Sequence, residues 1–214
     1  MPTDTWWNLS DEKRDRITHA AMVEFGNRGF SAGSLNVIAR EADVAKGSLF
    51  QYFDDKLDMF ATISEAGIGT IRDAALDGVD VEHDEYFPAL RRIVGNWLAF
   101  FSSHPVERSF AYAAGNEVDE EAGAAVRSVT SSHFVSELQP LVKGADARGE
   151  FRPDVEVDHV IAMTVLLLRH LDKAPWYAHV DPVLGLSEKG PAEVERIALA
   201  LVDGLERAYG RNGR

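Results

Sequence analysis

Residues 34–53, SLNVIAREADVAKGSLFQYF, contain two short helical segments on either side of a tight turn. Helical spacing predicts helices over 34–42 and 46–52, with Ile38 and Leu49 on their inward sides. Two short helices that cross in this way make a helix-turn-helix. Such a motif leaves the outer face of its second helix free to enter a DNA major groove.

An ordinary helical hairpin inside a bundle would show similar spacing, so other features have to decide between the two. The second helix, over 46–52, is too short to serve as a bundle helix. Its outward positions carry hydrogen-bond donors suited to base edges and phosphates, namely Lys46, Ser48, Gln51 and Tyr52. Both features favour a segment that reads nucleic acid.

The rest of the chain predicts an all-α protein of about nine helices, because spacings of three and four recur and no strand-like alternation persists. The first helix is expected over 10–28, capped by Ser10 and ended by Gly29. A helix starting at Lys56 follows the turn, with Asp55 as its cap. Prolines punctuate the later helices, which are expected over 86–103, 106–115, 118–139, 155–174 and 191–209. We therefore expect a three-helix head over 1–54 and a helical body over 55–214.

Composition limits the class of protein further. With 214 residues, 45% apolar and 27% charged, the chain is typical of a globular protein. It has no cysteine, which excludes disulfides, thiolate catalysis and zinc sites with sulfur ligands. The longest apolar run, 160–168, is too short to cross a bilayer and the N-terminus has no signal-peptide pattern, so we expect a soluble, cytoplasmic protein with no membrane partner. The net charge of −13 argues against a nonspecific polyanion binder.

Enzyme chemistry finds little support in the sequence. Glu156 and His159 have the spacing of a di-iron helix, but a second such pair is missing. The run 29–33 matches Gly-x-Ser-x-Gly, yet a nucleophile elbow needs a preceding strand and a helix is expected there. We expect no catalytic residues, no metal site and no cofactor.

Several motifs between Arg14 and Ile63 resemble, in order and register, the DNA-binding domain of the tetracycline-repressor (TetR) family of transcriptional regulators. They are FGNRGF at 25–30, IA at 38–39, VAKGSLF at 44–50 and YFDDK at 52–56. Farther on, GEFRPD at 149–154 is similar to a loop that precedes the last two helices in this family. The resemblance implies a DNA-binding head and, for the remainder, a fold.

The resemblance also implies DNA contacts at matching positions. Lys46 would donate to guanine while Gly47 permits close approach, and Tyr52 and Lys56 would hold phosphates. Ser34 would cap its helix and touch a phosphate. The full set of expected DNA-binding residues is Ser34, Asn36, Lys46, Gly47, Ser48, Phe50, Gln51, Tyr52 and Lys56.

Two positions depart from the family pattern. Asp43 stands at the turn where the family usually has glycine, so we expect aspartate to adopt a left-handed conformation there. Phe50 replaces a usual tyrosine, which removes one hydroxyl-to-phosphate hydrogen bond. The N-terminal tail has no basic residue before Lys13 and is a poor minor-groove arm, so Trp6 and Trp7 are expected to pack on the head or to be disordered.

The last helices of the body carry wide apolar stripes. Paired across a two-fold axis, the helices over 155–174 and 191–209 would form the four-helix dimer interface that the family implies, although the stripes also suit a monomer core. A homodimer would place two heads on a palindromic double-stranded DNA operator.

The family resemblance also implies an effector pocket in the body. For each residue expected to line this pocket, a role in ordinary core packing is the alternative. The residues expected to line it are Asn96, Trp97, Phe101, Phe110, Tyr112, Asn116, His133, Phe134, Met163, Leu167 and His170. A small, largely apolar effector that releases a repressor from DNA is the main functional hypothesis. A helical sensor or adaptor that does not bind DNA is the alternative, and the net charge favours it.

Overall fold

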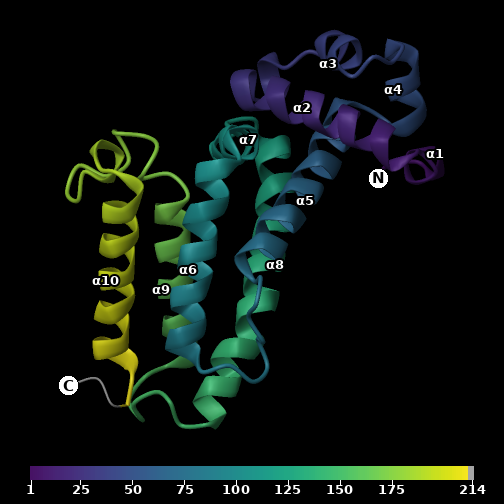
Figure 1. Ribbon diagram of the computed structural model, residues 1–214. Coiled ribbons are helices and arrows are strands. Elements are labelled where there is room, and N and C mark those ends of the chain that lie inside the picture. Colours follow the sequence, from purple (N-terminus) through teal and green to yellow (C-terminus); the bar gives the residue numbers. More distant parts are fainter. Residues whose placement is uncertain (212–214) are drawn as a thin grey trace. The chain divides into compact units, whose positions relative to one another are not determined.

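The computed structural model describes the backbone of residues 1–211, and their side chains except those of 129–135. This part of the chain is helical without a strand, which confirms the all-α prediction (Figure 1). It forms two compact units. The first comprises Met1–Thr70 with His104–Ser131, and the second comprises Ile71–Ser103 with the chain from Ser132 onward.

The first unit contains the helix-turn-helix and the elements packed on it. Its helices are α1 (Asp4–Trp7), α2 (Asp11–Ala32), α3 (Leu35–Glu41), α4 (Lys46–Tyr52), the start of α5 (Lys56–Ala75), α7 (Pro105–Gly115) and the start of α8 (Glu120–Ala147). The expected division at residue 54 therefore does not coincide with the compact units, because α7 packs closely on α2.

Helix α2 breaks where the sequence predicts its end. Gly29 has φ 69° and ψ 178°, a conformation open to glycine but not to residues with a side chain. One further helical turn follows and ends at Ala32. The Gly-x-Ser-x-Gly run thus lies at a helix end and not after a strand, which is why it forms no nucleophile elbow.

An aromatic and aliphatic core fixes α3 and α4 against α2. Ile38, Leu49 and Phe53 are at most 2% exposed, and Phe25 meets Phe60 edge to face with ring centroids 5.1 Å apart. In the turn between α3 and α4, Asp43 has φ 54° and is the one non-glycine residue with a positive φ among those described. The predicted left-handed aspartate is confirmed, and so is the capping of α5 by Asp55, whose Oδ1 accepts the Asp58 N–H at 2.8 Å.

The second unit is built around α6 (Tyr86–Ser103), which packs on α10 (Pro191–Tyr209) and on α9 (Val157–Leu171); a single 3-10 turn, Leu186–Glu188, precedes α10 (Figure 1). Most of the α6 residues that face its neighbours are buried aromatic or aliphatic side chains. Tyr86 is 1% exposed and its hydroxyl is hydrogen-bonded to Thr164 of α9. Burial raises the pKa of Tyr86 to about 12.

Helix α8 differs from the prediction that it ends at 139. Pro140 lies inside the helix, which continues to Ala147. Leu141, Val142 and Ala145 beyond the proline are fully buried, and the free energy of burying them offsets the loss of one backbone donor. No helix in the described part of the chain is long and apolar enough to span a bilayer.

Candidate nucleic-acid interface

The outer face of α4 is open to solvent. Lys46, Gly47, Phe50 and Gln51 are exposed and Ser48 is half-buried, while Leu49 between them is buried in the core. A Cβ atom added to Gly47 would meet nothing within 4 Å, so the backbone is bare at this point. The helix therefore presents a continuous polar and aromatic strip of the kind that reads a groove.

Phe50 is the most apolar member of this strip. Its side chain is 52% exposed, which is unusual for phenylalanine in a monomeric domain. The other exposed candidate of the motif, Asn36, lies on α3. Both side chains are accessible to a ligand as large as a DNA duplex.

Ser34 and Tyr52 differ from their expected roles. Ser34 occupies the N-cap position of α3, but its side chain makes no capping hydrogen bond; its backbone N–H donates instead to Glu24 Oε1 at 2.9 Å. Tyr52 is 4% exposed and lies beside Trp6, with ring centroids 6.3 Å apart. Its ring belongs to the core of the head and not to the open strip.

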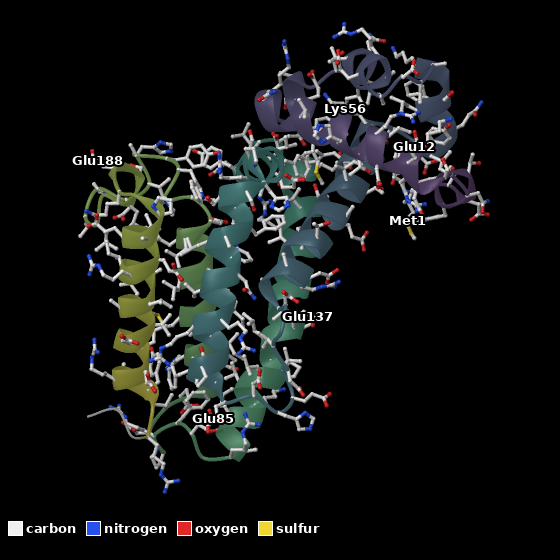
Figure 2. The ribbon with its side chains drawn as sticks, in the orientation of Figure 1. Met1, Glu12, Lys56, Glu85, Glu137 and Glu188 are labelled. Carbon is white, nitrogen blue, oxygen red and sulfur yellow. The ribbon has the colours of Figure 1, made fainter. Side chains whose placement is uncertain are left out.

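Lys56, labelled in Figure 2, is the first residue of α5 and is half-buried. Its ammonium lies 4.8 Å from the centroid of the Phe30 ring and donates to the Ser31 carbonyl at 3.1 Å. An ammonium has three donors, so these contacts fix its position and leave donors for a phosphate.

Acidic residues border the same surface. Asp43, Asp54 and Asp55 are all exposed around the ends of α4. Each of these carboxylates repels phosphates at short range and weakens binding to DNA of arbitrary sequence. DNA binding by a surface of this composition would depend on a few well-placed contacts and not on a broad positive electrostatic field.

Two contacts hold α2 of the head to α7 and the turn after it. Glu117 accepts the Phe30 N–H through Oε2 at 2.8 Å, and its Oε1 accepts the amides of Val118 and Asp119. At Gly26, an added Cβ would lie 3.0 Å from the backbone nitrogen of Phe110. Helix α2, on which the helix-turn-helix packs, is thus packed directly on a helix from the middle of the chain.

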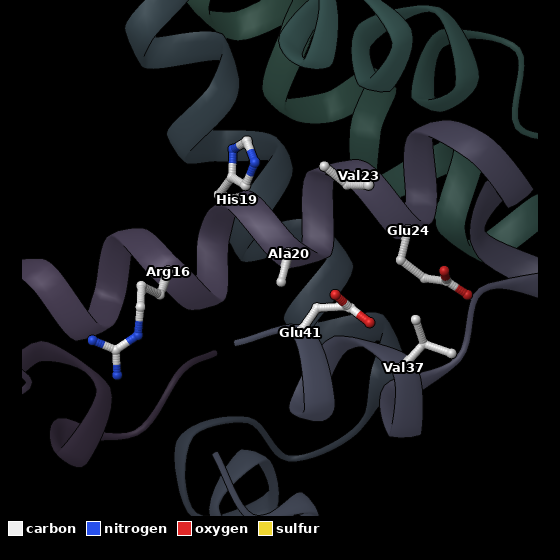
Figure 3. Close-up of a pocket in the computed structure, with 7 residues that line it drawn as sticks. All are labelled: Arg16, His19, Ala20, Val23, Glu24, Val37 and Glu41. Carbon is white, nitrogen blue, oxygen red and sulfur yellow. The ribbon is translucent and has the colours of Figure 1, made fainter. Parts of the chain in front are cut away.

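A groove of about 260 Å³ runs between α2 and α3 (Figure 3). Arg16, His19 and Glu24 line it from α2, and Val37 and Glu41 line it from α3. The carboxylate of Glu24 already accepts a hydrogen bond from the Ser34 N–H. None of the residues expected to bind DNA or effector lines this groove.

The residues expected to line an effector pocket are distributed over both units. In the second unit, Trp97 and Phe101 are buried and meet edge to face with centroids 5.1 Å apart. Asn96 departs from its expected role, because its Nδ2 donates to the carbonyls of Ala75 and Asp77 at 3.1 and 2.9 Å. It stabilises the end of α5 with the donors that were expected to orient a ligand.

On α9, Met163 is 38% exposed and Leu167 is half-buried. At the end of that helix, His170 Nε2 lies 3.8 Å from Asp181 Oδ2. A groove of about 330 Å³ between α6, α10 and Trp176 is lined by none of the expected residues; Leu98, Ala99 and Val194 form part of its wall. No sequence pattern predicted this groove, because its residues are typical of ordinary packing between helices.

In the first unit, Phe110 is buried against Phe60 and Tyr112 is half-buried. Asn116 is exposed and its Nδ2 donates to the Tyr112 carbonyl at 2.7 Å, so this amide also serves the helix end. The side chains of His133 and Phe134 lie outside the described residues.

The described part of the chain contains no group of three or more His, Cys, Asp or Glu residues that could hold a metal ion. Glu156 is the N-cap of α9 and His159 is exposed one turn later. Their spacing follows from the helix start and is not part of a metal-binding cluster.

The chain is all-helical and carries a helix-turn-helix whose second helix is exposed to solvent. This is the architecture of a helix-turn-helix regulatory protein. The sequence profile described as "Bacterial regulatory proteins, tetR family" matches residues 17–63. A TetR family transcriptional regulator from Chloroflexus aurantiacus has the same fold over 99% of this chain and 100% of its own, with a TM-score of 0.67 and 26% identity. Residues 17–63 therefore form a domain of the tetR family, and the chain as a whole resembles TetR family regulators in sequence and in fold.

Characterised relatives have regulatory functions. The transcriptional repressor NicS of Pseudomonas putida is 26% identical over 166 residues, which make up 74% of each chain. The repressor KstR of Mycobacterium tuberculosis is 29% identical over 117 residues, 51% of this chain and 53% of KstR. FadR from Bacillus subtilis, solved in complex with stearoyl-CoA, shares the fold with a TM-score of 0.71 at 15% identity, over 88% of this chain and 96% of FadR.

Proposed function

We propose that this protein is a homodimeric repressor that binds a palindromic operator and is released from it by a small, largely apolar effector. The observation that carries the proposal is the strip of α4 that is open to solvent although Leu49 within it is buried; the strip is formed by Lys46, Gly47, Ser48, Phe50 and Gln51. A strip of donors on a short, rigidly packed helix is what direct readout of a major groove requires.

Within this proposal, Lys46 donates to guanine and the bare backbone at Gly47 allows α4 to approach the bases closely. Gln51 pairs with adenine or lies along the backbone, and the exposed ring of Phe50 packs on a thymine methyl group. Lys56, held by Ser31 and Phe30, binds a phosphate beside the start of α5.

The dimer is proposed to form through α9 and α10. On α9, Ala162, Met163 and Leu166 are exposed, and Leu166 is 61% exposed. On α10, the flank next to the buried face carries Ile197, Ala200, Leu201, Gly204 and Ala208, none of which is buried. Apolar side chains at these positions suit a four-helix interface across a two-fold axis.

The effector is proposed to act on the body and to change how the heads fit DNA. The buried aromatic pair Trp97 and Phe101 supports an apolar ligand, and FadR is a protein of this fold solved with an acyl-CoA. Helix α5 is one continuous helix from Lys56, at the proposed DNA interface, to Ala75 in the second unit. A conformational change in the body is therefore transmitted to the head along this helix. A ligand that favours the form unfit for DNA lowers operator affinity by population shift.

The experiment is a mobility shift with DNA from upstream of the protein's own gene. We expect wild type to bind one sequence specifically, and Gly47→Ala to weaken binding by at least about tenfold, because the new methyl group separates α4 from the bases. Its melting temperature should be equal to that of wild type or slightly higher, since alanine favours the helix. Lys143→Ala is the matched control, since Lys143 is exposed on α8 in the second unit. Equal binding by Gly47→Ala and wild type would refute the assignment of α4.

A further inference from the structure

The first nine residues form a strap over the end of α4. The Thr3 N–H donates to the Tyr52 carbonyl at 2.9 Å, and the Thr3 hydroxyl donates to the Gln51 carbonyl at 2.6 Å. These are carbonyls at the C-terminal end of α4, which have no acceptor role inside the helix. Thr3, more than forty residues away in sequence, therefore caps the proposed recognition helix.

Apolar packing holds the same strap in place. Trp6 is 2% exposed, and its ring centroid lies 4.8 Å from that of Phe53, the C-cap residue of α4. The next residue, Trp7, is 60% exposed, so only one of the two tryptophans is anchored. Figure 1 shows α1, which carries both, beside the end of α4, and the two helices are in contact.

The helix that receives these contacts has little stability of its own. It has seven residues, and its N-cap, Ala45, has no side chain able to cap. A helix of this length forms few internal hydrogen bonds and depends on tertiary contacts for its order. The strap acts at Gln51, directly on the strip that faces solvent.

We propose that Thr3 and Trp6 are positioning residues for DNA recognition: they fix the C-terminal turn of α4, and with it Phe50 and Gln51, in the orientation that fits the groove. The N-terminal segment then contributes to affinity from behind the recognition helix and not as an arm in the minor groove. This inference rests on the proposed DNA-binding function of α4.

The test uses Thr3→Val, which removes the hydroxyl and keeps the shape and the backbone N–H, in the full-length protein. Thr3→Ser restores the donor, and Thr5→Val is the control, since Thr5 is exposed on α1 and its hydroxyl makes no hydrogen bond recorded among the described residues. Three quantities are measured for each variant: amide hydrogen exchange over residues 49–53, operator affinity and the melting temperature of the protein.

For Thr3→Val we expect faster exchange confined to the end of α4, about fivefold weaker operator binding and an unchanged melting temperature of the protein. Thr3→Ser and Thr5→Val should match wild type in all three measurements. Trp6→Ala should speed exchange and weaken binding further, and it should also lower the melting temperature because Trp6 is buried in the core. Trp7→Ala should match wild type.

Exchange over 49–53 that is the same in Thr3→Val and wild type would overturn the inference, and so would a loss of affinity that Thr3→Ser does not restore. A wild-type protein that binds no DNA would instead refute the proposed function. The exchange measurement needs no DNA, so the two failures are distinguishable.

Discussion

At the scale of single residues, Asp43 holds a conformation that costs free energy. Its φ of 54° brings Cβ close to the backbone, a strain that glycine does not have. We expect Asp43→Gly to raise the stability of the protein by up to about 1 kcal/mol and Asp43→Ala to lower it. Thermal unfolding of the three proteins measures this, and a lower melting temperature for Asp43→Gly would show that the carboxylate stabilises the turn.

A second residue-scale prediction concerns pH. Asp172 is the C-cap of α9, where the helix dipole disfavours a negative charge, and its Oδ1 is buried without a hydrogen-bond partner. Burial raises the pKa of Asp172 to about 7. The folded protein therefore keeps a proton that the unfolded chain has lost, and this stabilising contribution is present near pH 4 and lost as pH rises to 7.

Asp172→Asn removes the charge at every pH. We expect it to raise the free energy of unfolding by roughly 2–4 kcal/mol at pH 8 and by much less at pH 5, as measured by urea denaturation. Asp158→Asn, on the exposed first turn of the same helix, is the control. An equal effect of Asp172→Asn at both pH values would contradict the buried, raised-pKa carboxylate.

Residue patterns predicted the turn and the exposed strip, but not every contact. Asp43, Lys46 and Gly47 belong to one local motif, so their surroundings follow from nearby sequence. The burial of Tyr52 was not predictable, because it depends on Trp6, which lies in a segment without a helical pattern of its own. The hydrogen bonds of Asn96 were not predictable, because the carbonyls that it binds belong to α5 and the turn after it, and no sequence signal marks where α5 ends.

At the scale of secondary-structure elements, the contact between α2 and α7 is set by Gly26. A methyl group there would lie 3.0 Å from Phe110 N and 3.3 Å from Phe110 Cα, and backbone atoms cannot rotate away. We expect Gly26→Ala to destabilise the protein by about 1–3 kcal/mol despite the better helix propensity of alanine. Denaturant unfolding measures the change.

Gly69→Ala is the matched control, because Gly69 lies within α5 and an added Cβ meets nothing within 4 Å. It should stabilise the protein by up to about 1 kcal/mol through helix propensity alone. Effects of the same sign at Gly26 and Gly69 would mean that α2 and α7 are not in close backbone contact.

Helix positions were predictable wherever an apolar stripe repeats, as in α6 and α10. Helix lengths were less predictable. Pro140 predicts that α8 ends there, but the helix continues because residues beyond the proline are buried. The pairing of α7 with α2 could not be read from spacing, because it joins segments about eighty residues apart. Long-range packing of this kind also kept the compact units from coinciding with a division at residue 54.

At the scale of the whole molecule, the proposed repressor requires two copies of the chain. We expect Leu166→Glu, in the middle of the exposed α9 stripe, to yield a monomer in analytical ultracentrifugation and to lose at least roughly 100-fold in operator affinity, because the two heads are no longer linked. Val183→Glu is the control, since Val183 is 87% exposed in a loop of the second unit. A Leu166→Glu protein that is still dimeric would place the interface elsewhere.

The central claim is that two copies of α4 enter successive major grooves of one operator. Methylation protection of the bound operator tests this arrangement, because guanine is methylated at N7 in the major groove and adenine at N3 in the minor groove. Two protected patches are expected in the major groove, one helical turn or roughly 34 Å apart and related by the palindrome. A single patch, or protection confined to the minor groove, would contradict it.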